Sequence, residues 1–140
     1  MAPNKIVALL CLAAAALLYV SDKPGDLIVN PDKSPCPGTG LHMLIVEDRP
    51  NRRDLPPEQF DAMMSSDIDE LVRENGGHKY MYDQKQELST KNDPWVKDAM
   101  ALPRSKLPWL VLDFNGSGTS EPYPNTPQDA KALINKYLKK

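Results

Sequence analysis

The apolar and polar positions of this 140-residue chain separate three regions. Residues Ile6–Val20 form an uninterrupted apolar run, flanked by Lys5 and by Ser21-Asp22-Lys23. A stretch rich in proline and glycine follows over residues 23–40, which is typical of an extended, semi-stiff linker. From residue 41 onward, apolar runs, alternating segments and helical stripes succeed one another. We therefore expect one folded domain over residues 41–140.

Four segments of this domain have the pattern of β-strands. Leu41–Glu47 is almost wholly apolar, as in a strand covered on both faces, and Trp109–Phe114 is a second such run. His78–Asp83 alternates and carries two tyrosines, which favours a strand that is second in chain order. Asn115–Gly118 supplies a tight turn, after which we expect Thr119–Tyr123 to form a short fourth strand.

Helical stripes fill the intervals between the strands. Pro56-Pro57 opens a helix that we expect to break near Ser65 and to continue to Asn75, before Gly76-Gly77 ends it. The residues that should face the core are Phe60, Met63, Met64, Ile68, Leu71 and Val72.

Polar residues predict where the helices begin. Ser65-Ser66, with Asp69 downstream, suggests a cap for the second helical segment. Asp93 before Pro94 predicts a short helix that Pro103 terminates, and Thr126 before Pro127 predicts the last helix. The apolar stripe of that last helix comprises Ala130, Leu133, Ile134, Tyr137 and Leu138.

Residues 1–22 predict a signal peptide or a signal-anchor helix. The apolar run is shorter than the ~20 residues that span a bilayer, yet the positions after it offer poor cleavage sites. A cleaved export signal, an uncleaved anchor through residues 6–20 and a buried helix of a larger assembly all remain open. In the first two cases Lys5 stays inside. The protein is then exported or membrane-anchored, with its domain on the extracytoplasmic side.

Charge and cysteine content exclude several functions. The chain carries 17 basic and 19 acidic residues, a net charge of −2, and has no basic stripe, so nucleic acid is not an expected partner. Its two cysteines, Cys11 and Cys36, form no Cys-x-x-Cys and have no histidine close in sequence. Neither a metal nor another cofactor is therefore predicted. Cys36 is either an inert thiol or one that forms a disulfide with a partner.

The segment after the first strand is the first candidate for a site. Asp48–Leu55 is expected to be a charged loop at the carboxyl end of a strand, where open α/β folds place their ligands. Arg49, Arg52 and Arg53 are either solvated or positioned to hold an anion in bidentate fashion. Acid–base chemistry by Glu47, Asp48 and Arg49 is a weaker alternative.

The expected order of elements is similar to that of the thioredoxin family. Leu107-Pro108 before Trp109–Phe114, a glycine turn and a terminal helix resembles the family's cis-proline, its third and fourth strands and its last helix. Leu41–Glu47 resembles the strand that leads to its active-site helix. In finer detail, LPPEQF, MYDQKQELS and SKLPWLVLDFNGSG resemble uncharacterised thioredoxin-like proteins of bacteria and phages. The resemblance covers residues 41–138 and implies an α/β fold with a central four-stranded mixed sheet flanked by helices, here with an N-terminal apolar helix.

The chain departs from the family where the family carries Cys-x-x-Cys. Disulfide exchange needs a nucleophilic thiolate and a resolving partner, so dithiol oxidoreductase activity is not expected. The resemblance still implies a cis peptide bond before Pro108 and a groove that holds an extended peptide by backbone pairing. The residues expected to line this groove are Asp48, Arg49, Asn51, Lys106, Leu107 and Pro108.

These observations predict a non-catalytic interaction domain that binds a protein or peptide partner. The alternative is a structural subunit of a larger membrane or virion assembly. A redox or other enzyme is the third hypothesis.

Overall fold

The computed structural model describes residues 38–89 and 92–139. The expected signal or anchor segment, most of the linker, Cys11 and Cys36 therefore lie outside the described residues. Within the described ranges, no helix is both long enough and apolar enough to cross a bilayer.

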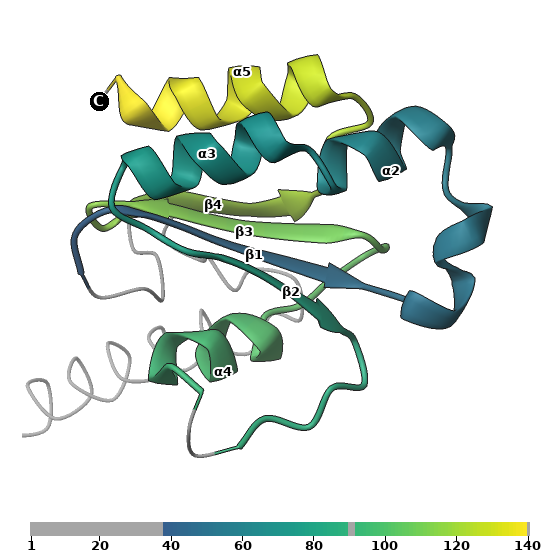
Figure 1. The fold of residues 1–140 in the computed structure, drawn as a ribbon. Coiled ribbons are helices and arrows are strands. Elements are labelled where there is room, and N and C mark those ends of the chain that lie inside the picture. Colours follow the sequence, from purple (N-terminus) through teal and green to yellow (C-terminus); the bar gives the residue numbers. More distant parts are fainter. Residues whose placement is uncertain (1–37, 90–91, 140) are drawn as a thin grey trace, which may run out of the picture. The chain divides into compact units, whose positions relative to one another are not determined.

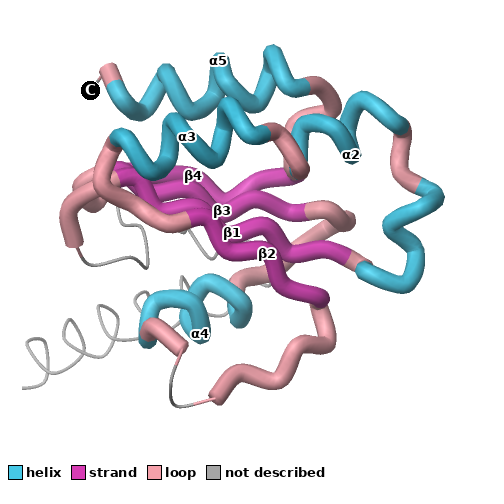
Figure 2. Tube along the Cα trace, viewed as in Figure 1, coloured by secondary structure: helices cyan, strands magenta, loops and turns pink. Residues whose placement is uncertain are grey.

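The four strands form one mixed sheet, as Figures 1 and 2 show. Their bounds are β1 Leu41–Glu47, β2 Lys79–Asp83, β3 Trp109–Phe114 and β4 Ser117–Pro122. The strand order is β2-β1-β3-β4. β1 runs parallel to β2 and antiparallel to β3, and β4 is antiparallel to β3. The expected α/β class and four-stranded mixed sheet are confirmed.

Helices cover both faces of the sheet. The helical elements are η1 (Arg49–Asp54, a 3-10 helix), α2 (Pro57–Met63), α3 (Ser66–Glu74), α4 (Pro94–Ala101) and α5 (Pro127–Leu138). Figure 1 shows α2, α3 and α5 on one face and α4 on the other. The predicted loop over Asp48–Leu55 is thus corrected to a short helix, in which Pro50 occupies the first turn and fixes a helical φ.

Two apolar clusters hold these layers together. The larger one lies under α2, α3 and α5 and includes Met43, Ile45, Met63, Ile68, Leu110, Leu112 and Ile134. The smaller one lies under α4 and includes Leu44, Val46, Trp95, Val96, Ala99, Trp109 and Val111. Because alternate residues of β1 and β3 serve opposite clusters, both strands are buried on both faces, as their unbroken apolar runs predicted.

Met64 is a correction to the predicted core. Its side chain is 50% exposed, whereas Met63, Ile68 and Val72 are buried. α2 ends at Met63 and α3 begins at Ser66, so the break changes the phase of the apolar stripe at Met64. The predicted break is confirmed, and one residue of the stripe falls outside the core because of it.

The hairpin turn is shorter than expected. Phe114 pairs with Ser117, which leaves Asn115 and Gly116 as the turn, with φ angles of 53° and 88°. Positive φ at both central residues is the requirement of a two-residue hairpin. β4 therefore begins at Ser117, two residues before its predicted start.

The predicted helix caps are formed at one helix of three. Thr126 accepts a hydrogen bond from the backbone N–H of Asp129 at 3.1 Å, as expected. Ser65 and Asp93 make no such side-chain bond. Asp93 instead accepts from the Tyr80 hydroxyl at 2.6 Å, and Asp69 pairs with Lys79.

Buried polar contacts fix α2 against the segment that follows β4. Gln59 is buried, and its amide nitrogen donates to the carbonyl oxygen of Tyr123 at 3.0 Å. The Tyr123 hydroxyl donates back to the carbonyl oxygen of Ala62 at 3.0 Å. Burial raises the pKa of the Tyr123 phenol, which therefore stays protonated as a donor. These bonds set the position of α2, and with it of η1, at the end of the sheet.

Candidate functional site

The carboxyl end of β1 meets the segment that precedes β3. Val46 pairs with Trp109, so the antiparallel register brings Pro108 level with Glu47. The peptide bond between Leu107 and Pro108 is cis, as predicted. The carbonyl of Pro108 accepts from the backbone N–H of Tyr123 at 3.0 Å, which extends the sheet by one bond at this end.

Four of the six predicted groove residues line one pocket here. This central pocket has a volume of about 200 Å³, and its lining comprises Glu47, Asp48, Asn51, Asp54, Leu55, Leu107 and Pro108. Asn51 donates to the Asp48 carboxylate at 2.7 Å, which fixes both side chains at its edge. The structure therefore brings Asp48, Asn51, Leu107 and Pro108 together.

The other two predicted residues lie outside the central pocket. The side chain of Arg49 is 54% exposed, and its Nε lies 3.7 Å from Glu47 Oε1. The backbone N–H of Arg49 donates to Asp83 at 2.8 Å. The N–H of Lys85 also donates to this carboxylate, and the bonds from Lys85 and Arg49 lower the pKa of Asp83. Lys106 lines a neighbouring pocket instead.

Glu47, which lines the central pocket, forms an ion pair with the partly buried Arg52. Glu47 is 1% exposed and accepts hydrogen bonds from Nε of Arg52, at 2.7 Å, and from its Nη2. These bonds raise the pKa of Arg52 against the opposing effect of desolvation. Arg52 is thus bound to an internal carboxylate, and the hypothesis of an anion held by Arg49, Arg52 and Arg53 loses its central residue.

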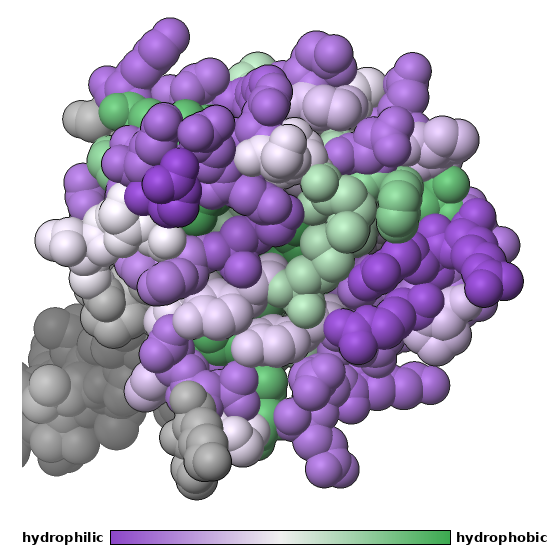
Figure 3. Space-filling model, in the orientation of Figure 1, coloured by the Kyte–Doolittle hydropathy of each residue, from purple (hydrophilic) through white to green (hydrophobic). Residues whose placement is uncertain are grey.

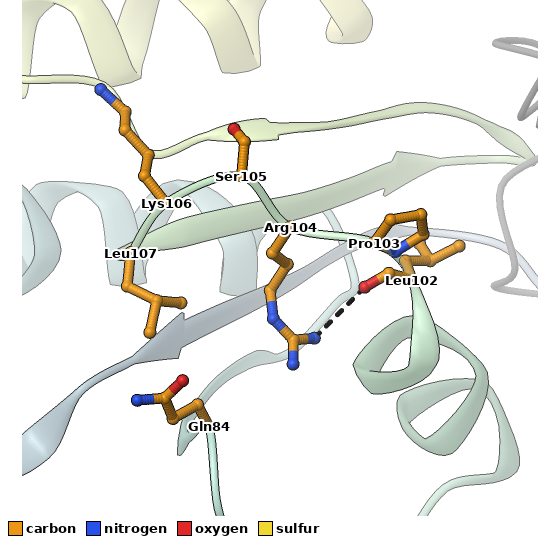
Figure 4. Close-up of a pocket in the computed structure, with 7 residues that line it drawn as sticks. All are labelled: Gln84, Leu102, Pro103, Arg104, Ser105, Lys106 and Leu107. Carbon is orange, nitrogen blue, oxygen red and sulfur yellow. Dashed lines mark hydrogen bonds between the residues drawn. The ribbon is translucent and has the colours of Figure 1, made fainter. Parts of the chain in front are cut away.

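Two further pockets adjoin the central one. On the α2 side, a pocket of about 390 Å³ is lined by Arg52, Arg53, Leu55, Pro57 and Phe60. On the α4 side, a pocket of about 540 Å³ is lined by Gln84, Leu102, Pro103, Arg104, Ser105, Lys106 and Leu107 (Figure 4). Leu55 is common to the first and central pockets, and Leu107 to the central and last. We call the three together the Leu55–Leu107 groove.

The surface around the groove is mixed in character. Figure 3 shows hydrophobic side chains gathered beside α2 and η1, bordered by hydrophilic ones.

Sequence reasoning missed the two ends of the groove. Phe60 was assigned to the core, and the sequence offered no signal that it would line a pocket with Leu55 and Pro57. Gln84 and Arg104 lie in loops and belong to no recognisable pattern. They come together because β2 ends and β3 begins at the same end of the sheet.

The described residues hold no group of three or more histidine, cysteine, aspartate or glutamate side chains arranged to bind a metal ion. No protein-family model matches the chain. A search of curated proteins likewise finds no match. The function has therefore to be argued from the geometry of the groove.

Proposed function

We propose that this protein is a non-catalytic, thioredoxin-like interaction domain that binds an extended segment of a protein or peptide partner in the Leu55–Leu107 groove. The observation that carries the proposal is the adjacency of three pockets, of which the central one shares Leu55 with the first and Leu107 with the last and is lined by Pro108.

The arrangement of the sheet supports the thioredoxin-like assignment. A strand order of β2-β1-β3-β4, with only β1 and β2 parallel among neighbours, agrees with the plan implied by the sequence resemblance. α2, α3 and α5 on one face, with α4 on the other, agree with it as well. The groove lies where that plan places its peptide-binding surface.

The form of the groove favours an extended chain over a compact ligand. An extended peptide advances ~3.3 Å per residue and places alternate side chains on one side. Pockets in series along a groove suit such alternate side chains, as in recognition by strand addition. The apolar side chains of Phe60, Leu55 and Leu107 would contact the partner, and the polar edge would set its register.

The proposal of export or membrane tethering rests on the apolar run Ile6–Val20 alone. The partner would then be an extracytoplasmic protein, met on the same side of the membrane as the domain.

A pair of leucine variants tests the proposed function. The full chain, in detergent, is panned against a displayed library of linear peptides, and the affinity of captured peptides is measured by fluorescence anisotropy. Leu107→Ala should weaken binding ~10-fold, equal to ~1.4 kcal/mol, because it removes the side chain common to two pockets. Leu133→Ala is the matched control, since Leu133 is also a partly buried leucine but packs in the cluster under α5.

Equal affinities for wild type and Leu107→Ala would contradict the groove. Co-purification of the chain with other subunits at fixed stoichiometry, unchanged by Leu107→Ala, would favour a structural subunit of an assembly instead.

A further inference from the structure

Arg104 forms one wall of the pocket on the α4 side. Its guanidinium Nη1 donates to the carbonyl oxygens of Met100, at 2.6 Å, and Leu102, at 3.4 Å. These bonds fix the group at the end of α4 while its Nε–H and Nη2–H groups remain for other acceptors. Figure 4 shows the guanidinium at the end of α4, across the pocket from Gln84 and Leu107, whereas Lys106 and Ser105 point away from it.

This guanidinium has no acidic partner among the described residues. None of the seven residues that line the pocket is acidic. The ion pairs of the described ranges join Glu47, Asp67, Asp69 and Glu70 to other cations. Arg52, the partly buried arginine that lines the pocket on the α2 side, is by contrast bound to Glu47 through two nitrogens. A partly buried Arg104 without a carboxylate is therefore the exception at this end of the sheet.

We infer that the Arg104 pocket is a carboxylate subsite. The planar guanidinium matches a carboxylate in bidentate geometry, and hydrogen bonds between two charged groups are about twice as strong as neutral ones. The amide of Gln84, on the opposite side of the pocket in Figure 4, supplies a further donor. Leu102, Pro103 and Leu107 cover the aliphatic part of the same ligand.

This inference rests on the proposed function in assigning the carboxylate to the bound peptide. A peptide that crosses Leu107 enters the Arg104 pocket at one end and the central pocket at the other. The central pocket carries Asp48 and Asp54, which repel a second acidic group. The partner segment should therefore present its carboxylate, from an acidic side chain or from a chain terminus, at the α4 end only.

Three small peptides test the subsite without a known partner. They are acetyl-Leu-Glu-amide, with a side-chain carboxylate, acetyl-Leu-Gln, with a terminal carboxylate, and acetyl-Leu-Gln-amide, with none. The full chain in detergent is titrated with each and followed by NMR at Arg104 Nε–H and the Gln84 side-chain amide. At least one acidic peptide should shift both signals saturably and bind ~10-fold tighter than the neutral one. The stronger of the two identifies the source of the carboxylate.

Substitutions then assign the effect to the pocket. Arg104→Gln should abolish the preference for the acidic peptide, and Gln84→Ala, at an exposed position, should weaken it several-fold without loss of fold. Lys97→Gln is the control, because Lys97 is an exposed cation on α4 that does not line the pocket. If Arg104→Gln fails to fold, the subsite is tested by comparing the preference for the acidic peptide in Gln84→Ala with that in Lys97→Gln.

Equal binding of the neutral and acidic peptides, or a preference that survives Gln84→Ala as fully as Lys97→Gln, would overturn the subsite. The test of the carboxylate subsite can fail or succeed independently of the test of the peptide groove. Leu55 lines the groove but not the Arg104 pocket, so a carboxylate preference combined with peptide binding that is insensitive to Leu55→Ala would retain the subsite and reject the peptide groove. Peptide binding that depends on Leu107 but not on charge would do the reverse.

Discussion

Glu47 lines the central pocket of the groove. Its buried carboxylate is paired with the guanidinium of Arg52 in η1. The Arg52 side chain is 28% exposed. Removing the charge of Glu47 leaves a partly buried guanidinium without its counter-charge, and breaking such a pair costs more than breaking a surface pair.

We predict that Glu47→Gln lowers the free energy of unfolding by ~1–3 kcal/mol, measured by urea denaturation. Glu70→Gln is the control, since the Glu70–Arg73 pair is exposed and should contribute ~0–1 kcal/mol. Equal effects of the two substitutions would mean that the buried pair adds nothing to stability beyond that of a surface pair.

Two glycines of the β3–β4 hairpin are required for different reasons, Gly116 for its backbone conformation and Gly118 for lack of space. A Cβ at Gly116 would contact nothing within 4 Å, but its φ of 88° is unfavourable for other residues. A Cβ at Gly118 would lie 1.9 Å from the carbonyl oxygen of Leu112, so the two strands would have to separate.

Gly118→Ala should therefore destabilise the protein far more than Gly116→Ala. We expect about 1–2 kcal/mol for Gly116→Ala, from backbone conformation alone. For Gly118→Ala we expect more than about 4 kcal/mol or failure to fold. Thermal unfolding followed by circular dichroism gives the comparison, and a reversed order would show that the strands yield more easily than the turn.

The contact between α3 and α5 has a pH dependence. Lys131 donates to Asp67 at 2.5 Å, and this bond lowers the pKa of Asp67 below its ordinary value of 3.8. A carboxylate whose pKa is lower in the folded state stabilises the fold above its unfolded pKa and loses that effect as the pH falls through its folded pKa.

Asp67→Asn should therefore lower the urea midpoint at pH 6, and the difference from wild type should shrink as the pH falls from about 4 to about 2. A difference that stays constant over this range would show that the ion pair does not link the helices in solution. Asp98→Asn serves as a control, since Asp98 is an exposed aspartate of α4 that is in no ion pair of the described residues.

The elements that could be predicted from sequence are those fixed by neighbours in the chain. Unbroken apolar runs gave the bounds of β1 and β3, and Pro56-Pro57 with Gly76-Gly77 gave the helical pair between them. The misplaced features depend on partners far along the chain. The Asp93 carboxylate accepts a hydrogen bond from Tyr80 instead of capping α4, and no local sequence pattern indicates this contact.

The candidate site divides in the same way. Asp48 and Asn51 were expected at the site because they follow a strand end, and Leu107 and Pro108 because the resemblance to the thioredoxin family implies a cis-proline segment opposite that end. The ends of the groove were not found, since Phe60 and Arg104 join it only through the packing of α2 and α4 against the sheet. Arg49 was misplaced because η1 turns its side chain outward.

At the scale of the whole domain, stability should follow the position of each strand. β1 and β3 are hydrogen-bonded on both sides and buried on both faces, whereas the described structure gives β2 and β4 one neighbour each. Amides that open only with the whole domain exchange most slowly.

Hydrogen exchange followed by NMR should accordingly show the slowest amides in β1 and β3. Amides of β4 should exchange faster, because an edge strand can separate without exposing the core. If β4 were protected as strongly as β1, an additional element would have to cover that edge.

The direction of the strands determines how far the ends of the described chain lie from the groove. The groove lies at the carboxyl end of β1, and α5 runs back to the opposite end, where Figure 1 places the C-terminus near the start of β1. A seven-residue strand is ~23 Å long, so both entry and exit of the described chain are remote from the groove. A fluorophore or a fused reporter attached after α5 would thus lie at the end of the domain opposite the groove.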